Sequence, residues 1–127
     1  MKKSLFLFIV LLSVFSINLN AQTDDKVYTV AEQMPFFKGN IINYLSTHIH
    51  KSAVASANKK NKCVIVKFIV EKDGSISNVM VIHHVEPVLD NEALRVIRNM
   101  PKWNPGKING KNVRVWFTLP VLFKEKK

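Results

Sequence analysis

VIVKFIV, residues 64–70, is the stretch that decides the fold of this chain. In an extended strand, residues 64, 66, 68 and 70 lie on one face, and all four are apolar. The residues that follow, Lys72-Asp73-Gly74-Ser75, have turn chemistry, and Asp73-Gly74 is a strong hairpin signal. Ile76–His83 is predicted as a second strand, in which Val79 and Val81 share one face. The sequence therefore predicts an antiparallel hairpin at its centre.

A helix is predicted before this hairpin. Ile41, Leu45 and Ile49 recur every four residues, which predicts a helix over 41–50 with Gly39-Asn40 as its cap. Residues 53–57 are expected to add a further turn, and the basic run from Lys59 to Lys62 is expected to form a solvated loop.

A second helix is predicted after the hairpin, over 88–99. Pro87 suits the first turn of a helix, and Pro101 ends it. Asp90 and Glu92 lie near the positive end of the helix dipole, where acids interact favourably with it. The buried stripe of this helix is formed by Leu89, Ala93, Val96, Ile97 and Met100.

The last element is the clearest strand, over 113–123, because its apolar residues alternate with a second set along its whole length. Pro120 has no N–H to donate, so this strand is expected to lie at a sheet edge or to carry a bulge. The order helix, strand, strand, helix, strand predicts the α+β class, with two helices packed on one face of a three-stranded antiparallel sheet.

The N-terminal segment has the pattern of an export signal. Lys2 and Lys3 precede an apolar run over 5–14, and Ala21 offers a cleavage site. We expect residues 1–21 to be a signal peptide, 22–35 an extended leader with a short extended piece over 27–30, and 36–127 the folded domain. The alternative is an uncleaved signal anchor that tethers the domain to the inner membrane. Either outcome places the domain outside the cytoplasm.

Composition narrows the function classes. With 47% hydrophobic residues in 127 the chain is expected to be globular, and Cys63, its one cysteine, excludes an intrachain disulfide. Without Lys2 and Lys3, 17 Lys and Arg stand against 9 acids, a formal charge of +8. This charge favours anionic lipid, envelope polymers or acidic protein segments as partners. Nucleic acid is not expected, because no Arg and aromatic stripe is present.

No catalytic or metal site is predicted. The chain has no phosphate-binding glycine loop and no nucleophile elbow. His48 and His50 are two residues apart on a predicted helix, and His83 and His84 are neighbours at a strand end, so neither pair converges. We therefore expect no enzyme activity, no bound metal and no cofactor.

Four segments resemble one family. They are 27–36 (VYTVAEQMPF), 64–76 (VIVKFIVEKDGSI), 89–95 (LDNEALR) and 100–107 (MPKWNPGK). The last three are similar to the C-terminal domain of TonB energy transducers as it occurs in Bacteroidetes-type sequences, and the first resembles the segment that often precedes it. The resemblance covers nearly all of the chain after the signal and implies the fold predicted above.

The resemblance also implies a function in the periplasm. In the family, the domain captures a short extended motif, the TonB box, of an outer-membrane transporter by adding that strand to its sheet. Two departures concern this expectation. His50-Lys51-Ser52 stands where family members commonly carry a Tyr-Pro pair, and only a few residues separate Ala21 from Val27, where complete transducers have a long Pro-rich spacer. If the signal is cleaved, the chain is therefore not expected to transmit force.

The candidate site is the edge of the last strand, whose unpaired backbone groups can accept a partner strand. Its residues are Val113, Arg114, Val115, Trp116, Phe117, Thr118 and Leu119. A structural motif is expected in the turns beside it, formed by Asp73, Gly74, Pro101, Trp103, Pro105 and Gly106. The expected partners are TonB-dependent outer-membrane transporters or related envelope proteins. The alternative is an interaction module that binds anionic polymer, lipid or a second copy of itself through its basic surface.

Overall fold

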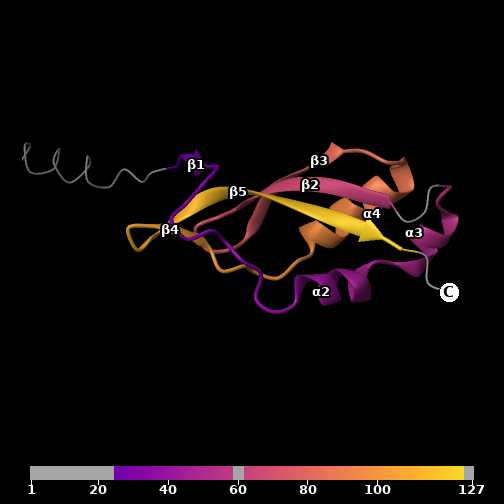
Figure 1. Ribbon diagram of the computed structural model, residues 1–127, viewed down its shortest axis with the longest axis horizontal. Helices are drawn as coiled ribbons and strands as arrows, with labels where there is room; N and C mark the ends of the chain where they lie inside the picture. The colour runs from indigo at the N-terminus through magenta and orange to yellow at the C-terminus, as the bar shows by residue number, and fades with distance from the viewer. Residues whose placement is uncertain (1–24, 59–61, 125–127) are drawn as a thin grey trace, which may run out of the picture.

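The computed structural model describes residues 25–58 and 62–124, so the expected signal over 1–21 lies outside the described residues (Figure 1). The elements are β1 (Val27–Tyr28), α2 (Ile41–His48), α3 (Lys51–Ser56), β2 (Lys62–Val70), β3 (Ile76–His83), α4 (Pro87–Arg98), β4 (Gly106–Ile108) and β5 (Lys111–Phe123).

The predicted α+β class is confirmed. The sheet has the order β1-β5-β2-β3, and β4 forms a hairpin with the start of β5. The long strands β2, β3 and β5 are antiparallel to their neighbours, whereas β1 runs parallel to β5. Figure 1 shows the long strands together, with the helices gathered to one side of them. The sheet thus has two more strands, β1 and β4, than the three that the pattern predicted.

The alternation of β2 places the core. Residues 64, 66, 68 and 70 are fully buried, and they pack with Leu45 of α2 and with the apolar stripe of α4. Burial of this apolar surface is the main force that holds both helices against one face of the sheet. The opposite face carries no helix among the described residues, and it presents Met80, Ile82 and Leu122, which are about half exposed.

The helix predicted over 41–50 is two helices with a break between them. Asn40 caps α2 through its side chain, and the backbone becomes extended at Ile49 and His50 before α3 begins. The buried carboxylate of Glu92 on α4 accepts a hydrogen bond from the His50 backbone N–H at 2.6 Å. Arg95 donates to the same carboxylate at 2.7 and 2.9 Å and to the His48 carbonyl at 2.7 Å.

Glu92 and Asp90 are therefore more than acids near a helix dipole. Burial pushes the pKa of Glu92 upward, but the hydrogen bonds from Arg95 and His50 outweigh burial, so the pKa lies below its ordinary value. Asp90 is also buried, and it accepts a hydrogen bond from the Val85 backbone N–H at 3.0 Å. Asp90 thus holds the backbone that precedes α4, and Glu92 holds the backbone between α2 and α3.

The hairpin turn docks on the loop before β4. Gly74 has φ +88° and accepts a hydrogen bond from the Trp103 backbone N–H at 2.8 Å. A Cβ at Gly74 would lie 2.0 Å from the Trp103 carbonyl oxygen, so only glycine fits there. The Trp103 ring is buried and makes edge contacts with Phe68 and Phe117. Asp73 stabilises the turn by accepting a hydrogen bond from the Ser75 N–H at 3.0 Å.

The described part of the leader, from Asp25 onward, is folded onto the sheet. Gln33 exchanges backbone hydrogen bonds with Lys107 at 2.8 and 3.0 Å, and Phe36 does so with Asn104 at 2.9 and 3.1 Å. A second, smaller core forms beneath it, and a Cβ at Gly106 would lie 2.6 Å from a methyl group of this core. The core consists of Ala31, Val113 and Val115, with Tyr28 and Ile108 packed against it. Pro101 lies exposed beyond the end of α4, and Pro105 directly precedes β4.

Candidate functional site

The sheet has two edges, and β3 forms the irregular one. Its pairing with β2 shifts register between Ile65 and Val66 and again between Lys67 and Ile69. Asn78 lies opposite the shift between Lys67 and Ile69, and its φ of +50° is in the left-handed region. Bulges of this kind twist an edge strand and interrupt its outward hydrogen-bonding groups. The outer side of β3 is therefore a poor template for a further strand.

β5 is regular along the whole of its contact with β2. Nine consecutive pairs, from Lys62 with Phe123 to Val70 with Val115, keep one register without a shift. Pro120 sits inside this ladder opposite Ile65, with no bulge, in the part of β5 that has no second partner strand among the described residues. A proline fits a ladder only where its nitrogen faces away from the neighbouring strand.

This proline defines the direction of the backbone groups along β5. Since Pro120 directs its nitrogen outward, residues two positions away do the same with their N–H and C=O groups. Thr118 and Leu122 therefore offer outward donors and acceptors, and Pro120 offers an outward carbonyl. The alternate residues, Phe117, Leu119 and Val121, direct their groups toward β2.

The start of β5 is already paired with β4 and β1. Val113 pairs with Gly106 of β4, and the two residues of β1 pair with Arg114 and Val115. Among residues 25–58 and 62–124, no strand pairs with the outer side of β5 beyond Val115. Of the seven residues predicted as the site, three are therefore already paired with β1 or β4 within the fold. The other four, Trp116 to Leu119, begin an open segment. That segment continues to Phe123, past the predicted boundary.

Arg114 acts as a clamp within the fold. Its guanidinium meets the Glu71 carboxylate at 2.6 and 3.1 Å and also donates to the Asp25 carbonyl at 2.8 Å. The hydrogen bonds from Arg114 outweigh burial and hold the pKa of Glu71 below its ordinary value, and the same pair raises the pKa of Arg114. This clamp joins β5 to the end of β2 and to the leader.

Trp116 and Thr118 lie on the sheet face away from the helices. The Lys67 ammonium lies 4.6 Å from the centre of the Trp116 ring, which is a cation–π distance. Ile69, the strand neighbour of Trp116, is buried on this face although no helix covers it among the described residues. Thr118 is exposed, so its side chain is accessible beside the outward backbone groups. Phe117, by contrast, packs into the aromatic cluster with Phe68 and Trp103.

The elements α2, α3, β2 and β5 carry no acid. Residues 33–70 and 93–124 contain no Asp or Glu, and they include α2, α3, β2 and β5. The charges along these elements are therefore those of lysine and arginine, which attract an acidic partner over a neutral one.

Neither a metal centre nor a membrane span emerges from the described part of the chain. Within residues 25–58 and 62–124, no three His, Cys, Asp or Glu side chains gather as a metal-binding group. In the same ranges, no helix has the length and apolar character needed to cross a bilayer.

Fold and edge together define an α+β domain with a regular, half-open edge strand, which is the arrangement of a strand-pairing interaction module. Comparison with known proteins agrees. The chain belongs to the family described as the Gram-negative bacterial TonB protein C-terminal, whose model matches residues 50–124. No curated protein and no solved structure matches the chain. The family is a non-catalytic interaction module of the cell envelope that serves TonB-dependent transport.

Sequence reasoning missed several residues that matter for this edge. Glu92 and Arg95 clamp the helix break, and Asn78 marks a bulge, yet Glu92 was assigned only to a helix dipole and Asn78 to a regular strand. The signal for β1 was present, because residues 27–30 were predicted to be extended. Its partner was not predictable, since parallel pairing over two residues leaves no pattern in β5.

Proposed function

We propose that this protein captures an extended segment of TonB-dependent outer-membrane transporters, or of related envelope proteins, by strand addition to β5. The segment adds to the outer side between Phe117 and Phe123. The observation that carries this proposal is the unshifted ladder through Pro120, which directs the groups of Thr118 and Leu122 away from β2.

The hydrogen bonds available set the expected affinity. Thr118 and Leu122 supply two donors, and the carbonyls of Thr118, Pro120 and Leu122 supply three acceptors. Each hydrogen bond contributes about 0.5 to 1.5 kcal/mol net. Ordering the partner offsets much of this gain, so we expect roughly micromolar binding unless side chains add to it. Trp116 and Thr118 are the side chains positioned to add contacts from the open face.

The leader defines where the partner begins. β1 ends its pairing at Val115, so a partner strand starts beyond that point or replaces β1. The lack of acids in α2, α3, β2 and β5 favours a partner segment that carries Asp or Glu.

We place this activity in the periplasm, on the strength of the N-terminal export pattern. With the signal over 1–21 removed, the leader over 22–35 and the domain over 36–127 form an adaptor that modulates or competes with complete transducers. N-terminal sequencing of the chain from expressing cells tests this part, because a start at Gln22 supports the adaptor and a start at Met1 indicates a tethered form.

A capture experiment tests the strand addition. The immobilised protein is incubated with envelope extract at physiological and at high salt, and the transporters retained are measured. We expect wild type and Thr118→Ala to retain them at both salts, because backbone pairing is little affected by screening. Thr118→Pro removes an outward N–H and is expected to retain far less. Equal retention by Thr118→Pro and Thr118→Ala would exclude backbone pairing at this position, and retention at low salt alone would indicate capture by basic charge.

A further inference from the structure

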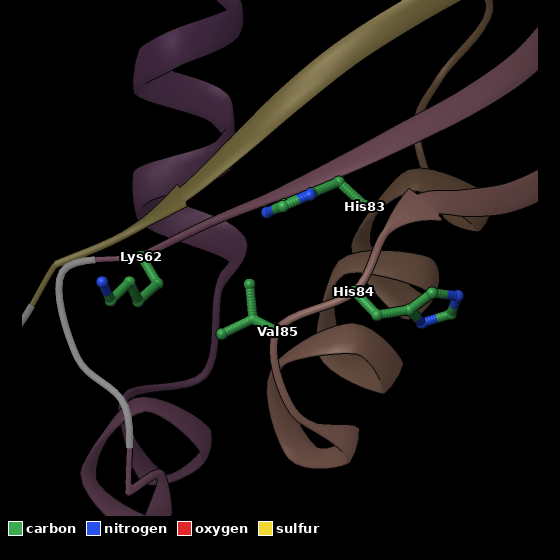
Figure 2. A pocket seen from close by; sticks show the side chains of 4 residues that line it. All are labelled: Lys62, His83, His84 and Val85. Atoms are coloured by element: carbon green, nitrogen blue, oxygen red, sulfur yellow. The ribbon is translucent and has the colours of Figure 1, made fainter.

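A hollow of about 330 Å³ lies at the end of the sheet where β2 begins and β3 ends. It is bordered by Lys62 at the start of β2, by His83 and His84, and by Val85 before α4 (Figure 2). Figure 2 shows the His83 ring extending toward the side of Lys62, with Val85 between them, while the His84 ring is directed away. Two cationic or hydrogen-bonding groups from different strands thus share one depression.

The nearby acids are engaged elsewhere. Asp90 accepts from the Val85 backbone N–H at 3.0 Å and lies 2.9 Å from Nδ1 of His84, which accounts for the direction of that ring. Glu86 accepts from the Asn58 backbone N–H at 3.2 Å. Among the described residues, Lys62 and His83 have neither a hydrogen bond nor an ion pair through their side chains. The hollow therefore presents donors without acceptors.

The register of the sheet adds a third cation at this end. Lys62 pairs with Phe123, so Lys124 follows directly and is exposed. At the opposite end of the sheet, Arg114 is paired with Glu71 and Lys102 with Asp73.

We propose that this hollow binds a phosphate group. The Lys62 ammonium and an N–H of His83 donate to its oxygens, and Val85 forms an apolar wall. A phosphate has oxygens directed to several sides, so it can accept from donors on two strands at once, and an imidazole donates an N–H in either protonation state. The phosphate can belong to a small molecule or to the head group of a membrane lipid, and both offer the same tetrahedral anion to the hollow.

The test uses the protein as it is purified from expressing cells. Inorganic phosphate and glycerol phosphate are titrated while NMR follows the His83 ring, and flotation follows binding to phosphatidylcholine vesicles with and without phosphatidylglycerol. Lys62→Gln and His83→Gln are each expected to weaken binding about three- to tenfold, because each removes a donor at a partly exposed site. Lys111→Gln, which changes the same charge at the start of β5, is expected to alter binding by less than about twofold.

The outcomes are distinguishable. Binding of phosphate in solution supports a small-molecule source, and binding only to vesicles that contain phosphatidylglycerol supports a lipid head group. Binding of neither, or equal weakening by Lys111→Gln and Lys62→Gln, overturns the proposal in favour of unfocused surface charge. Because Lys62 and His83 are exposed, both variants are expected to keep the wild-type melting temperature. Thr118→Pro is expected to leave phosphate binding unchanged, so this proposal and strand capture fail separately.

Discussion

The two strands that flank β2, β3 on one side and β5 on the other, have opposite characters. β3 pairs with β2 through two register shifts, whereas β5 pairs with it through nine residues in one register. β3 is also fastened from behind by α4, which is itself anchored through Asp90 and Glu92. An exposed edge becomes a binding surface only where its outward groups are regularly spaced. We therefore propose β5 as the partner-binding strand, and we expect the bulges of β3 to protect that strand against unwanted pairing.

Amide hydrogen exchange is the measurement with the largest expected effect on this comparison. Along β5 beyond Trp116, the amides of Phe117, Leu119 and Val121 face β2 and should exchange slowly. Those of Thr118 and Leu122 face outward and should exchange faster, on the order of a thousandfold or more. Uniformly slow exchange over 117–122 would show that the outer side is already paired, and the proposed function would then lose its basis. No partner is needed for this experiment.

How far the sequence predicted this edge can be argued from particular residues. Alternation over 113–123 predicted the strand, and Pro120 restricted it to an edge or a bulge, because the missing N–H is a local property. The bulges of β3 depend on how two strands are matched across the sheet. Asn78 tolerates the left-handed region and so gave a weak signal of a bulge. Nothing in the side chain of Ile82 indicates the other shift, which lies between Ile65 and Val66.

The helix break illustrates the same limit. The four-residue spacing of Ile41, Leu45 and Ile49 predicted a continuous helix, and it holds as far as His48. The backbone turns at His50 because a carboxylate 42 residues later accepts its N–H. A tertiary hydrogen bond of this kind leaves no periodic pattern, so Glu92 was read from its local position alone.

Proline substitution at adjacent positions of β5 sharpens the comparison further. Phe117→Pro removes an inward hydrogen bond and the aromatic contacts with Phe68 and Trp103, so we expect a loss of about 4 kcal/mol or more in unfolding free energy. Residue 118 directs its backbone nitrogen outward, as Pro120 does, so Thr118→Pro removes no hydrogen bond to β2. We therefore expect a folded protein whose partner binding is about tenfold weaker. Urea unfolding and partner titration measure the two effects. Similar destabilisation by both variants would contradict the alternation of backbone direction.

Glu92→Gln tests the hydrogen bonds by which α4, the helix that packs against β3, is anchored. The buried carboxylate holds the His50 N–H and Arg95, so we expect a loss of about 2 to 3 kcal/mol in unfolding free energy, with partner binding to β5 unchanged in the folded protein. Asn91→Gln, on the exposed side of the same helix, is the matched control and should lie within about 0.5 kcal/mol of wild type.

The pH dependence of the Glu92 contribution has a definite sign. Because the pKa of Glu92 is lowered in the folded state, its stabilisation is fully present above the ordinary carboxyl range and is lost as the pH falls through the folded value. Unfolding measured from neutral to acidic pH should show a shallower loss in Glu92→Gln than in wild type. Parallel curves for the two proteins would mean that Glu92 is not charged in the folded protein.

The smallest effect concerns β1, which limits the open edge. Tyr28→Pro removes the N–H of a two-residue strand, so the outward amide of Arg114 should exchange roughly tenfold faster. Tyr28→Ala keeps this N–H while losing the ring that packs against the small core of Ala31, Val113 and Val115, so it separates strand pairing from packing. If a partner replaces β1 instead of starting beyond it, Tyr28→Pro should also bind the partner a few times more tightly than Tyr28→Ala, because the competing strand is weakened. Equal affinities would mean that the partner strand begins beyond Val115 and that β1 serves only to close the upstream part of the edge.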